Sequence, residues 1–233
     1  MMLVKAQSLI IIGLLSGCAG QEMLFPAPYK IMITGNTLVF DGVIAGDAVL
    51  DAIRMVRTSD SKIETLRITS PGGEIASGIE FGYFVKEKGL EVEVSQLCFS
   101  ACANYILTAA SHITIKKDAL IGWHGGANQS DALWKQSVLP KDHENLIVYI
   151  NRLRIKEAAF FDAIQVDQKI TTYGQVNRNR CQAGKTTDGW YYSQEDLKKM
   201  GVDSVEIQGG TLLNSMEYNG TKISACLMPN LFS

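Results

Sequence analysis

The sequence predicts an α/β fold with a largely parallel core sheet. Segments rich in β-branched and aromatic residues alternate along the chain with segments that carry apolar residues at helical spacing. In such an alternation each helix connects one strand to the next, which places neighbouring strands parallel. The 233 residues are 46% apolar and 20% charged, so we expect one globular domain.

The first half of the chain combines a hairpin with strands and helices in alternation. Gly35 and Asn36 separate two short β-branched runs, a pattern typical of a hairpin. The strands of this half are expected at residues 29–33, 37–40, 63–69 and 92–97, and the helices at residues 47–57 and 74–88.

The second half continues the alternation around one irregular region. Ser193 precedes Glu195 and Asp196, which is typical of a helix N-terminus, and Gly201 ends that helix. The region 165–188 is polar and less regular, and the tail from residue 209 has no clear period. The other elements are expected as an apolar helix at 99–110, strands at 113–116 and 120–123, a long helix at 144–164 and a strand at 202–207.

The N-terminus has the features of a bacterial lipoprotein. Lys5 precedes an apolar run that is too short to span a bilayer and is typical of a signal peptide. Leu15-Ser16-Gly17-Cys18 then resembles a lipobox, in which cleavage precedes the cysteine and its thiol is acylated. An ordinary signal peptide with a chance cysteine is the alternative. The expected divisions are a signal peptide at 1–17, a tether at 18–28 and the folded domain at 29–233.

These features also predict where the protein resides. An acyl chain on Cys18 would hold the domain on the periplasmic face of a bacterial membrane. Ala19, in place of an aspartate after the cysteine, favours the outer membrane. A net charge of −2 gives no electrostatic reason to bind nucleic acid.

Four further cysteines, an even number in an oxidising compartment, predict disulfides. Three pairings are open, and we favour Cys98–Cys102 with Cys181–Cys226. Cys226 is also the one indication that the tail docks on the domain. A zinc site formed by Cys98, Cys102 and a histidine is the alternative, but the spacing matches no common zinc motif, and we expect neither a metal nor a cofactor.

Ser70-Pro71-Gly72-Gly73 stands where a predicted strand leads into a helix. Glycine lets backbone N–H groups come close to a bound group, because it has no side chain. The turn is therefore either a simple chain reversal or one wall of a site.

Two polar residues follow at the ends of later strands. Ser100 lies where a strand leads into an apolar helix, whose first N–H groups, those of Ser100 and Ala101, would be unpaired and could stabilise an oxyanion. His124, next to Trp123 and Gly125, could be a partly shielded base that still reaches a cleft. A helix cap and a structural histidine are the respective alternatives.

The order of these segments resembles the Clp protease proteolytic subunit and its relatives in the ClpP/crotonase superfamily. The resemblance runs from about residue 39 to residue 207 and rests on Ser-Pro-Gly-Gly after a strand, then Ser100, then His124. It is strongest to a periplasmic branch with a Cys-x-Ser-Ala-Cys motif, and the segment Trp190 to Asp203 resembles the closing helix and strand. The resemblance implies a spiral of β-β-α units around a mostly parallel core sheet.

The resemblance also implies residue roles. Ser100 would be the nucleophile, His124 its base, and Gly73 and Ala101 the donors of backbone N–H groups to the oxyanion. The glycines would then keep side chains off the backbone that approaches a substrate carbonyl. Asp188 corresponds to the acid of the triad, displaced by one residue.

Two features bear on this assignment. Asp142 and Glu144 are nearer to His124 in the sequence than Asp188 but match no family position. Leu97-Cys98-Phe99 replaces the small, glycine-containing approach to the serine, so that a disulfide in the motif would brace the nucleophile turn.

The predicted function is that of a lipid-anchored serine hydrolase, a peptidase for short or unfolded peptides. It would be independent of ATP, because the space outside the cytoplasm supplies none. The alternatives are a non-catalytic binding module with the same cleft and a CoA-thioester enzyme, which would not need Ser100. Association with further copies of the chain is also open.

Overall fold

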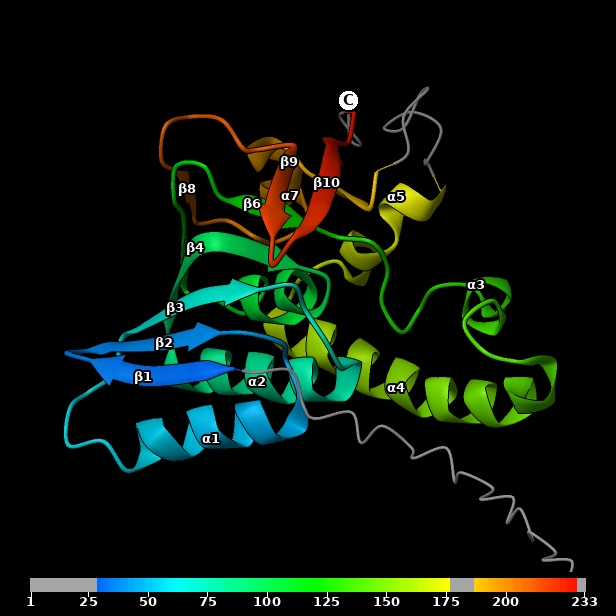
Figure 1. Cartoon of the computed structure of the whole chain (residues 1–233), viewed down its shortest axis with the longest axis horizontal. Helices are drawn as coiled ribbons and strands as arrows, with labels where there is room; N and C mark the ends of the chain where they lie inside the picture. Colours follow the sequence, from blue (N-terminus) through cyan, green and yellow to red (C-terminus); the bar gives the residue numbers. More distant parts are fainter. Residues whose placement is uncertain (1–28, 177–186, 230–233) are drawn as a thin grey trace, which may run out of the picture.

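The computed structural model describes residues 29–176 and 187–229, which form a mixed α/β fold around a mostly parallel seven-stranded sheet (Figure 1). This confirms the predicted α/β class with a mostly parallel sheet. The strand order is β1-β2-β3-β4-β5-β8, with β6 also paired to β4, and only β1 and β2 are antiparallel. The strands are β1 Lys30–Thr34, β2 Thr37–Asp41, β3 Thr65–Ser70, β4 Glu91–Phe99, β5 His112–Ile115, β6 Leu120–Gly122 and β8 Val205–Ile207.

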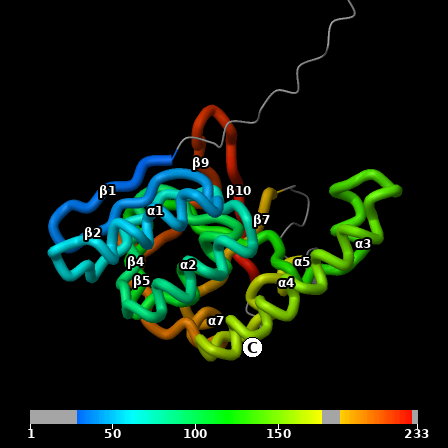
Figure 2. The backbone as a smooth tube through the Cα atoms, turned by 90° about the horizontal axis from the view of Figure 1, so that it is seen from below, coloured from blue at the N-terminus to red at the C-terminus, as the bar shows by residue number. Residues whose placement is uncertain are grey.

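Helices cover one side of this sheet. Figure 1 shows α1 (Gly46–Arg57) and α2 (Ile75–Lys88) on the same side, with α4 (His143–Ile164) beside α2. Phe160 of α4 packs edge-on against the ring of Tyr83 in α2, at 5.1 Å between ring centroids. Figure 2 shows that α3 and the start of α4 project beyond the rest of the domain.

The shorter helical elements lie between the strands of the second half. They are the π-helix η1 (Cys102–Leu107), α3 (Asp131–Lys135), η2 (Pro140–Asp142), η3 (Gln168–Thr171), α5 (Tyr173–Val176) and α7 (Gln194–Lys199). Across residues 29–176 and 187–229, no helix combines the length and the apolar character needed to cross a membrane.

The strand β4 brings the predicted site residues together. Its first part, Glu91 to Val94, pairs with β5, and its last part, Leu97 to Phe99, pairs with β6. The pairing of β4 with β3 also shifts register here, because Ile68 pairs with Val94 but Ser70 pairs with Cys98. Because these strands are parallel, the carboxyl ends of β3, β4 and β6 meet at one edge of the sheet, where the candidate residues follow them.

The C-terminal tail forms a hairpin that its sequence did not predict. β9 (Ser215–Tyr218) and β10 (Thr221–Leu227) are antiparallel, and β10 also pairs in parallel with β7 (Gly189–Tyr191). Ala225 of β10 belongs to a small apolar cluster with Leu97 and Phe99 of β4, whereas Cys98 between them faces the main core. The three-stranded sheet therefore covers the face of β4 that is turned away from the main core.

The region around Ser100 differs in detail from the expected helix at 99–110. Phe99 is still part of β4, and the helical turns begin after it, with a π-helix over Cys102–Leu107. A disulfide between Cys98 of β4 and Cys102 of η1 lies at this junction. A wider π-helical turn of this kind is rare and is often found at functional sites.

Candidate active site

Ser100 occupies a tight turn between β4 and η1. Its φ angle of 58° lies in the left-handed region, which is uncommon for a residue other than glycine. Its N–H donates to the carbonyl of Gly122 at 2.9 Å, and its carbonyl accepts the N–H of Asn104 at 2.8 Å. The backbone of the turn is thus fixed on both sides. The Ser100 N–H is paired, contrary to expectation, and the Ala101 N–H alone remains for an oxyanion in this turn.

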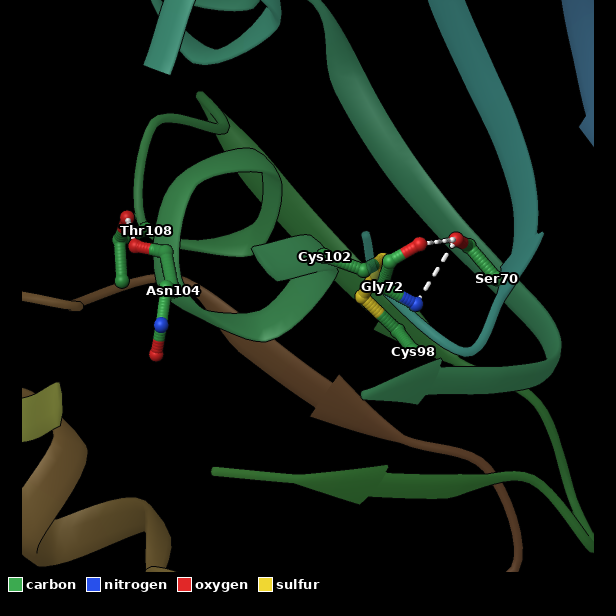
Figure 3. The surroundings of a disulfide bond; sticks show 6 residues. All are labelled: Ser70, Gly72, Cys98, Cys102, Asn104 and Thr108. Carbon is green, nitrogen blue, oxygen red and sulfur yellow. Dashed lines mark hydrogen bonds between the residues drawn. A yellow bond between two sulfur atoms is a disulfide. The ribbon is translucent and has the colours of Figure 1, made fainter. Parts of the chain in front are cut away.

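A disulfide braces the same turn. Cys98 and Cys102 are bonded, with their Cα atoms 5.2 Å apart, and both residues are fully buried. Figure 3 shows the bridge next to Gly72, whose N–H donates to the Ser70 hydroxyl at 3.1 Å. Because the bridge links the residues two positions before and after Ser100, it restrains both sides of the Ser100 turn.

The second predicted bridge can be followed only in part. Cys226 on β10 is disulfide-bonded. Cys181 lies outside the described residues, as does Cys18. The pairing Cys181–Cys226 and the acylation of Cys18 therefore stay predictions.

The two glycines of the turn after β3 are needed for contacts within the protein. A Cβ on Gly72 would lie 2.5 Å from the Cβ of Ser100, and a Cβ on Gly73 would lie 2.2 Å from the carbonyl oxygen of Ile44. Both have φ in the range that favours glycine, 99° and 152°. The glycines therefore let the turn pack against Ser100 and Ile44, in addition to keeping side chains off the cleft.

This packing directs the Gly73 backbone toward Ser100. Ile44 forms a parallel bridge with Gly73, in which the Ile44 N–H donates to Gly72 and the Ile44 carbonyl accepts from Glu74. In a parallel bridge, the residue that lies between the two bonded positions, here Gly73, directs its own N–H and carbonyl away from the partner segment. The Gly73 N–H thus points away from Ile44, and Gly73 lines the same cleft as Ser100 and Ala101.

His124 contacts Ser100 directly. Its Nε2 lies 2.6 Å from the Ser100 Oγ, within hydrogen-bond distance. Its ring stacks on Phe99, with centroids 5.5 Å apart and planes at 28°. The carbonyl of His124 accepts a hydrogen bond from the Gln175 side chain at 3.2 Å. Both predicted residues therefore meet in one hydrogen bond, and the Ser100 side chain does not cap the helix.

Asp188 is near His124 but is bonded elsewhere. Trp123 and Trp190 form an antiparallel bridge, which sets Asp188 beside the residues that follow Trp123. Oδ2 of Asp188 accepts hydrogen bonds from the N–H and the hydroxyl of Ser224, at 2.8 and 2.9 Å. Among the described residues, nothing hydrogen-bonds to Nδ1 of His124. Asp188 thus acts on the imidazole through its charge.

The surroundings of His124 favour its neutral form. Desolvation by the packed protein atoms lowers its pKa below the ordinary value, although the residue is exposed at the surface of the cleft. The charge of Asp188 acts in the opposite direction and raises this pKa. Desolvation is the larger effect. At neutral pH the imidazole is therefore free to accept a proton from Ser100.

Ser100 and His124 open onto a cleft of about 250 Å³, which Asn104, Gln129 and Trp134 also line. The charged alternatives do not enter it: Asp142 lies in η2 and Glu144 in the first turn of α4, and neither contacts His124. Within residues 29–176 and 187–229, no group of three or more histidine, cysteine or acidic side chains could hold a metal ion.

Sequence reasoning missed one buried acid beside the site, Glu157 of α4. Its side chain is fully buried and bonds to the loop that follows His124. A signal was present, because Glu157 is spaced four residues from both Leu153 and Phe161 on the apolar face of the helix. A charged residue at such a position has to find polar partners in the core.

Comparisons with known proteins assign no family. Neither a protein-family model nor a curated protein matches the sequence. Among solved structures, the chain is similar to a crystal structure of methylmalonyl CoA decarboxylase, at 8% sequence identity and a TM-score of 0.31. The match covers 40% of this chain and 47% of that one, so this chain spans less than half of its length. A likeness this low supports no conclusion about activity, and any proposal must depend on the site itself.

Proposed function

We propose that the protein is a serine hydrolase that cleaves short or unfolded peptides without ATP. The observation that carries the proposal is the 2.6 Å contact between the Ser100 Oγ and the His124 Nε2. Ser100 makes this contact from a left-handed turn, a conformation that costs free energy and that concentrates at functional sites.

The geometry supports an acyl-transfer mechanism. The Ser100 Oγ attacks the carbonyl carbon of the substrate while its proton passes to Nε2 of His124. The negative oxygen that results lies toward the N–H groups of Gly73 and Ala101. His124 then gives the proton to the leaving amine, and a water molecule, deprotonated in the same way, hydrolyses the acyl-enzyme and releases Ser100.

The setting of the domain belongs to the same proposal. We place it on the periplasmic face of a bacterial membrane, with the outer membrane favoured, held by an acyl chain on Cys18. The unit β1-β2-α1 at the start of the domain supports a ClpP/crotonase-like spiral of β-β-α units, although α2 and η1 each follow a single strand, β3 and β4. A cleft of about 250 Å³ suits a short segment of peptide at Ser100 better than a folded protein.

A non-catalytic binding module is the second candidate, and one observation favours it. The carboxylate of Asp188 is taken up by Ser224, and Nδ1 of His124 has no acceptor among the described residues. A triad histidine normally donates Nδ1–H to its acid, which fixes the productive tautomer. A chain that had lost catalysis could keep the cleft in this form.

Labelling with a fluorophosphonate probe distinguishes the two candidates. The wild-type protein should be acylated at Ser100, and Ser100→Ala should abolish labelling while the circular dichroism spectrum stays unchanged. Ser111→Ala is the matched control, because its hydroxyl bonds to the Gly89 carbonyl away from the cleft, and it should label as the wild type does. A folded wild-type protein that neither labels nor cleaves peptides or esters would exclude the hydrolase and leave the binding module.

A further inference from the structure

The carboxylate of Glu157 connects the two segments that carry Ser100 and His124. Oε1 accepts the hydroxyl of Tyr105 at 2.6 Å and the N–H of Ala127 at 2.8 Å. Oε2 accepts the N–H of Asn128 at 3.1 Å and the side-chain amide of Gln168 at 3.0 Å. Tyr105 belongs to η1, which follows Ser100, and the two N–H groups belong to the loop that follows His124.

This carboxylate is an unusual group to find in a core. Glu157 is fully buried, and among the described residues no cation pairs with it. The nearest arginine of its helix, Arg154, binds Asp131 and the carbonyls of Ala127 and Gln129 instead. A buried charge without a counter-ion is costly, so its four hydrogen bonds must hold to keep the fold intact.

The loop packs against the carboxylate without space for adjustment. A Cβ on Gly126 would lie 2.5 Å from Oε1 of Glu157. The carbonyl of the preceding residue, Gly125, accepts the side-chain N–H of Asn104 from η1 at 2.8 Å. The residues directly after His124 are thus hydrogen-bonded to α4 through Glu157 and to η1 through Asn104.

We propose that Glu157 is a positioning residue. It holds the loop that follows His124 and the helix η1, which follows Ser100, in a fixed relation to each other. The proposal rests on the proposed function only in taking Ser100 and His124 as the reacting pair. One carboxylate contacts both segments, so a shift of either one relative to the other stretches a bond to a buried charge. The energetic cost of such a shift keeps Nε2 of His124 at hydrogen-bond distance from the Ser100 Oγ.

Glu157→Gln tests this with a side chain of the same shape. In either orientation the NH2 group of glutamine faces a backbone N–H, that of Ala127 or that of Asn128, which cannot accept a hydrogen bond. The loop should move away, which removes protein atoms that pack around the His124 ring and desolvate it. Its pKa should then rise toward the ordinary histidine value, and fluorophosphonate labelling should slow by about tenfold or more through misplacement of the base.

Histidine NMR reads the first effect without any reaction. The chain has three histidines, and His124→Ala assigns the Cε1–H signal of His124. In Glu157→Gln this signal should titrate at higher pH, while those of His112 and His143 stay unchanged. Asp188, and not Glu157, is the charged residue that acts on His124. A shift of the His124 pKa in Glu157→Gln therefore reports movement of the ring and not the loss of the Glu157 charge. Asp162→Asn removes a charge from an exposed position of the same helix and should change neither readout.

The two readouts separate the two proposals. A folded Glu157→Gln protein whose His124 titrates as in the wild type overturns the positioning role, whether or not the protein labels. A wild-type protein that never labels overturns the hydrolase, and the titration still decides the role of Glu157. If Glu157→Gln fails to fold, Tyr105→Phe removes only the hydroxyl on the Ser100 side. Labelling and the His124 signal both unchanged in that variant would equally overturn the role.

Discussion

A single methyl group at Gly72 would measure how tightly the turn at Ser100 is packed. The Cβ of Gly72→Ala would lie 2.5 Å from the Cβ of Ser100, 2.6 Å from the Phe99 carbonyl oxygen and 2.9 Å from the Ala101 nitrogen. Two of these atoms are backbone, so the turn itself must move. Overpacking of this kind costs about 1–3 kcal/mol, and alanine at a φ of 99° adds about 1–2 kcal/mol of strain. We expect the free energy of unfolding to fall by about 2–5 kcal/mol in total.

Gly35→Ala separates the two contributions. Gly35 has a φ of 61° in the β1–β2 hairpin, and a Cβ there would meet nothing within 4 Å. Its substitution should therefore cost the strain alone, about 1–2 kcal/mol. The difference between the two variants is the cost of packing against the Ser100 turn.

Urea denaturation and fluorophosphonate labelling are the two measurements. Gly72→Ala should lower the urea midpoint by more than Gly35→Ala does, at an unchanged m value. It should also slow labelling, because the methyl group displaces Ser100, whereas Gly35→Ala should label at the wild-type rate. Equal losses of stability in the two variants, or normal labelling of a folded Gly72→Ala protein, would refute the packing argument.

Three further outcomes are expected. Labelling should increase with pH with a midpoint below about 6.5, because desolvation lowers the pKa of His124. Asp188→Asn should lower that midpoint further, since it removes the charge that raises this pKa. A labelling rate independent of pH would contradict this. The Cys98–Cys102 bridge spans a sequence separation of 4, so replacing both cysteines by alanine should cost about 2 kcal/mol in urea denaturation, and an unchanged midpoint would speak against it. Cys18→Ser should move the protein from the membrane to the soluble fraction, and continued membrane association would exclude the lipid anchor.

Local sequence patterns were sufficient for the elements that carry Ser100 and His124. Ser100 directly follows β4 and His124 lies two residues after the end of β6, and parallel strands bring their carboxyl ends to one edge of a sheet. Their meeting at 2.6 Å follows from the pairing of β4 with β6. The same pairing gives the Ser100 N–H its acceptor, Gly122, which helix rules could not foresee because they consider only neighbours in the chain.

The parts that escaped prediction depend on contacts between distant segments. β9 and β10 have mixed polar and apolar faces, and Ala225 is buried only because Leu97 and Phe99 lie beneath it. Glu157 could be marked as an acid on an apolar face, but its partners come from three other segments. Asp188 was placed by resemblance alone, and its bonds to Ser224 depend on the pairing of β7 with β10.

The last strand of the described chain has a consequence for the order in which the site can form. Ser224 on β10 holds the carboxylate of Asp188 in place, and it is synthesised 100 residues after His124. A growing chain therefore contains Ser100 and His124 long before the strand that binds Asp188 and covers β4. The Asp188 contacts can form only after Ser224 has been synthesised, so a polypeptide truncated before β10 lacks them even though it carries Ser100 and His124.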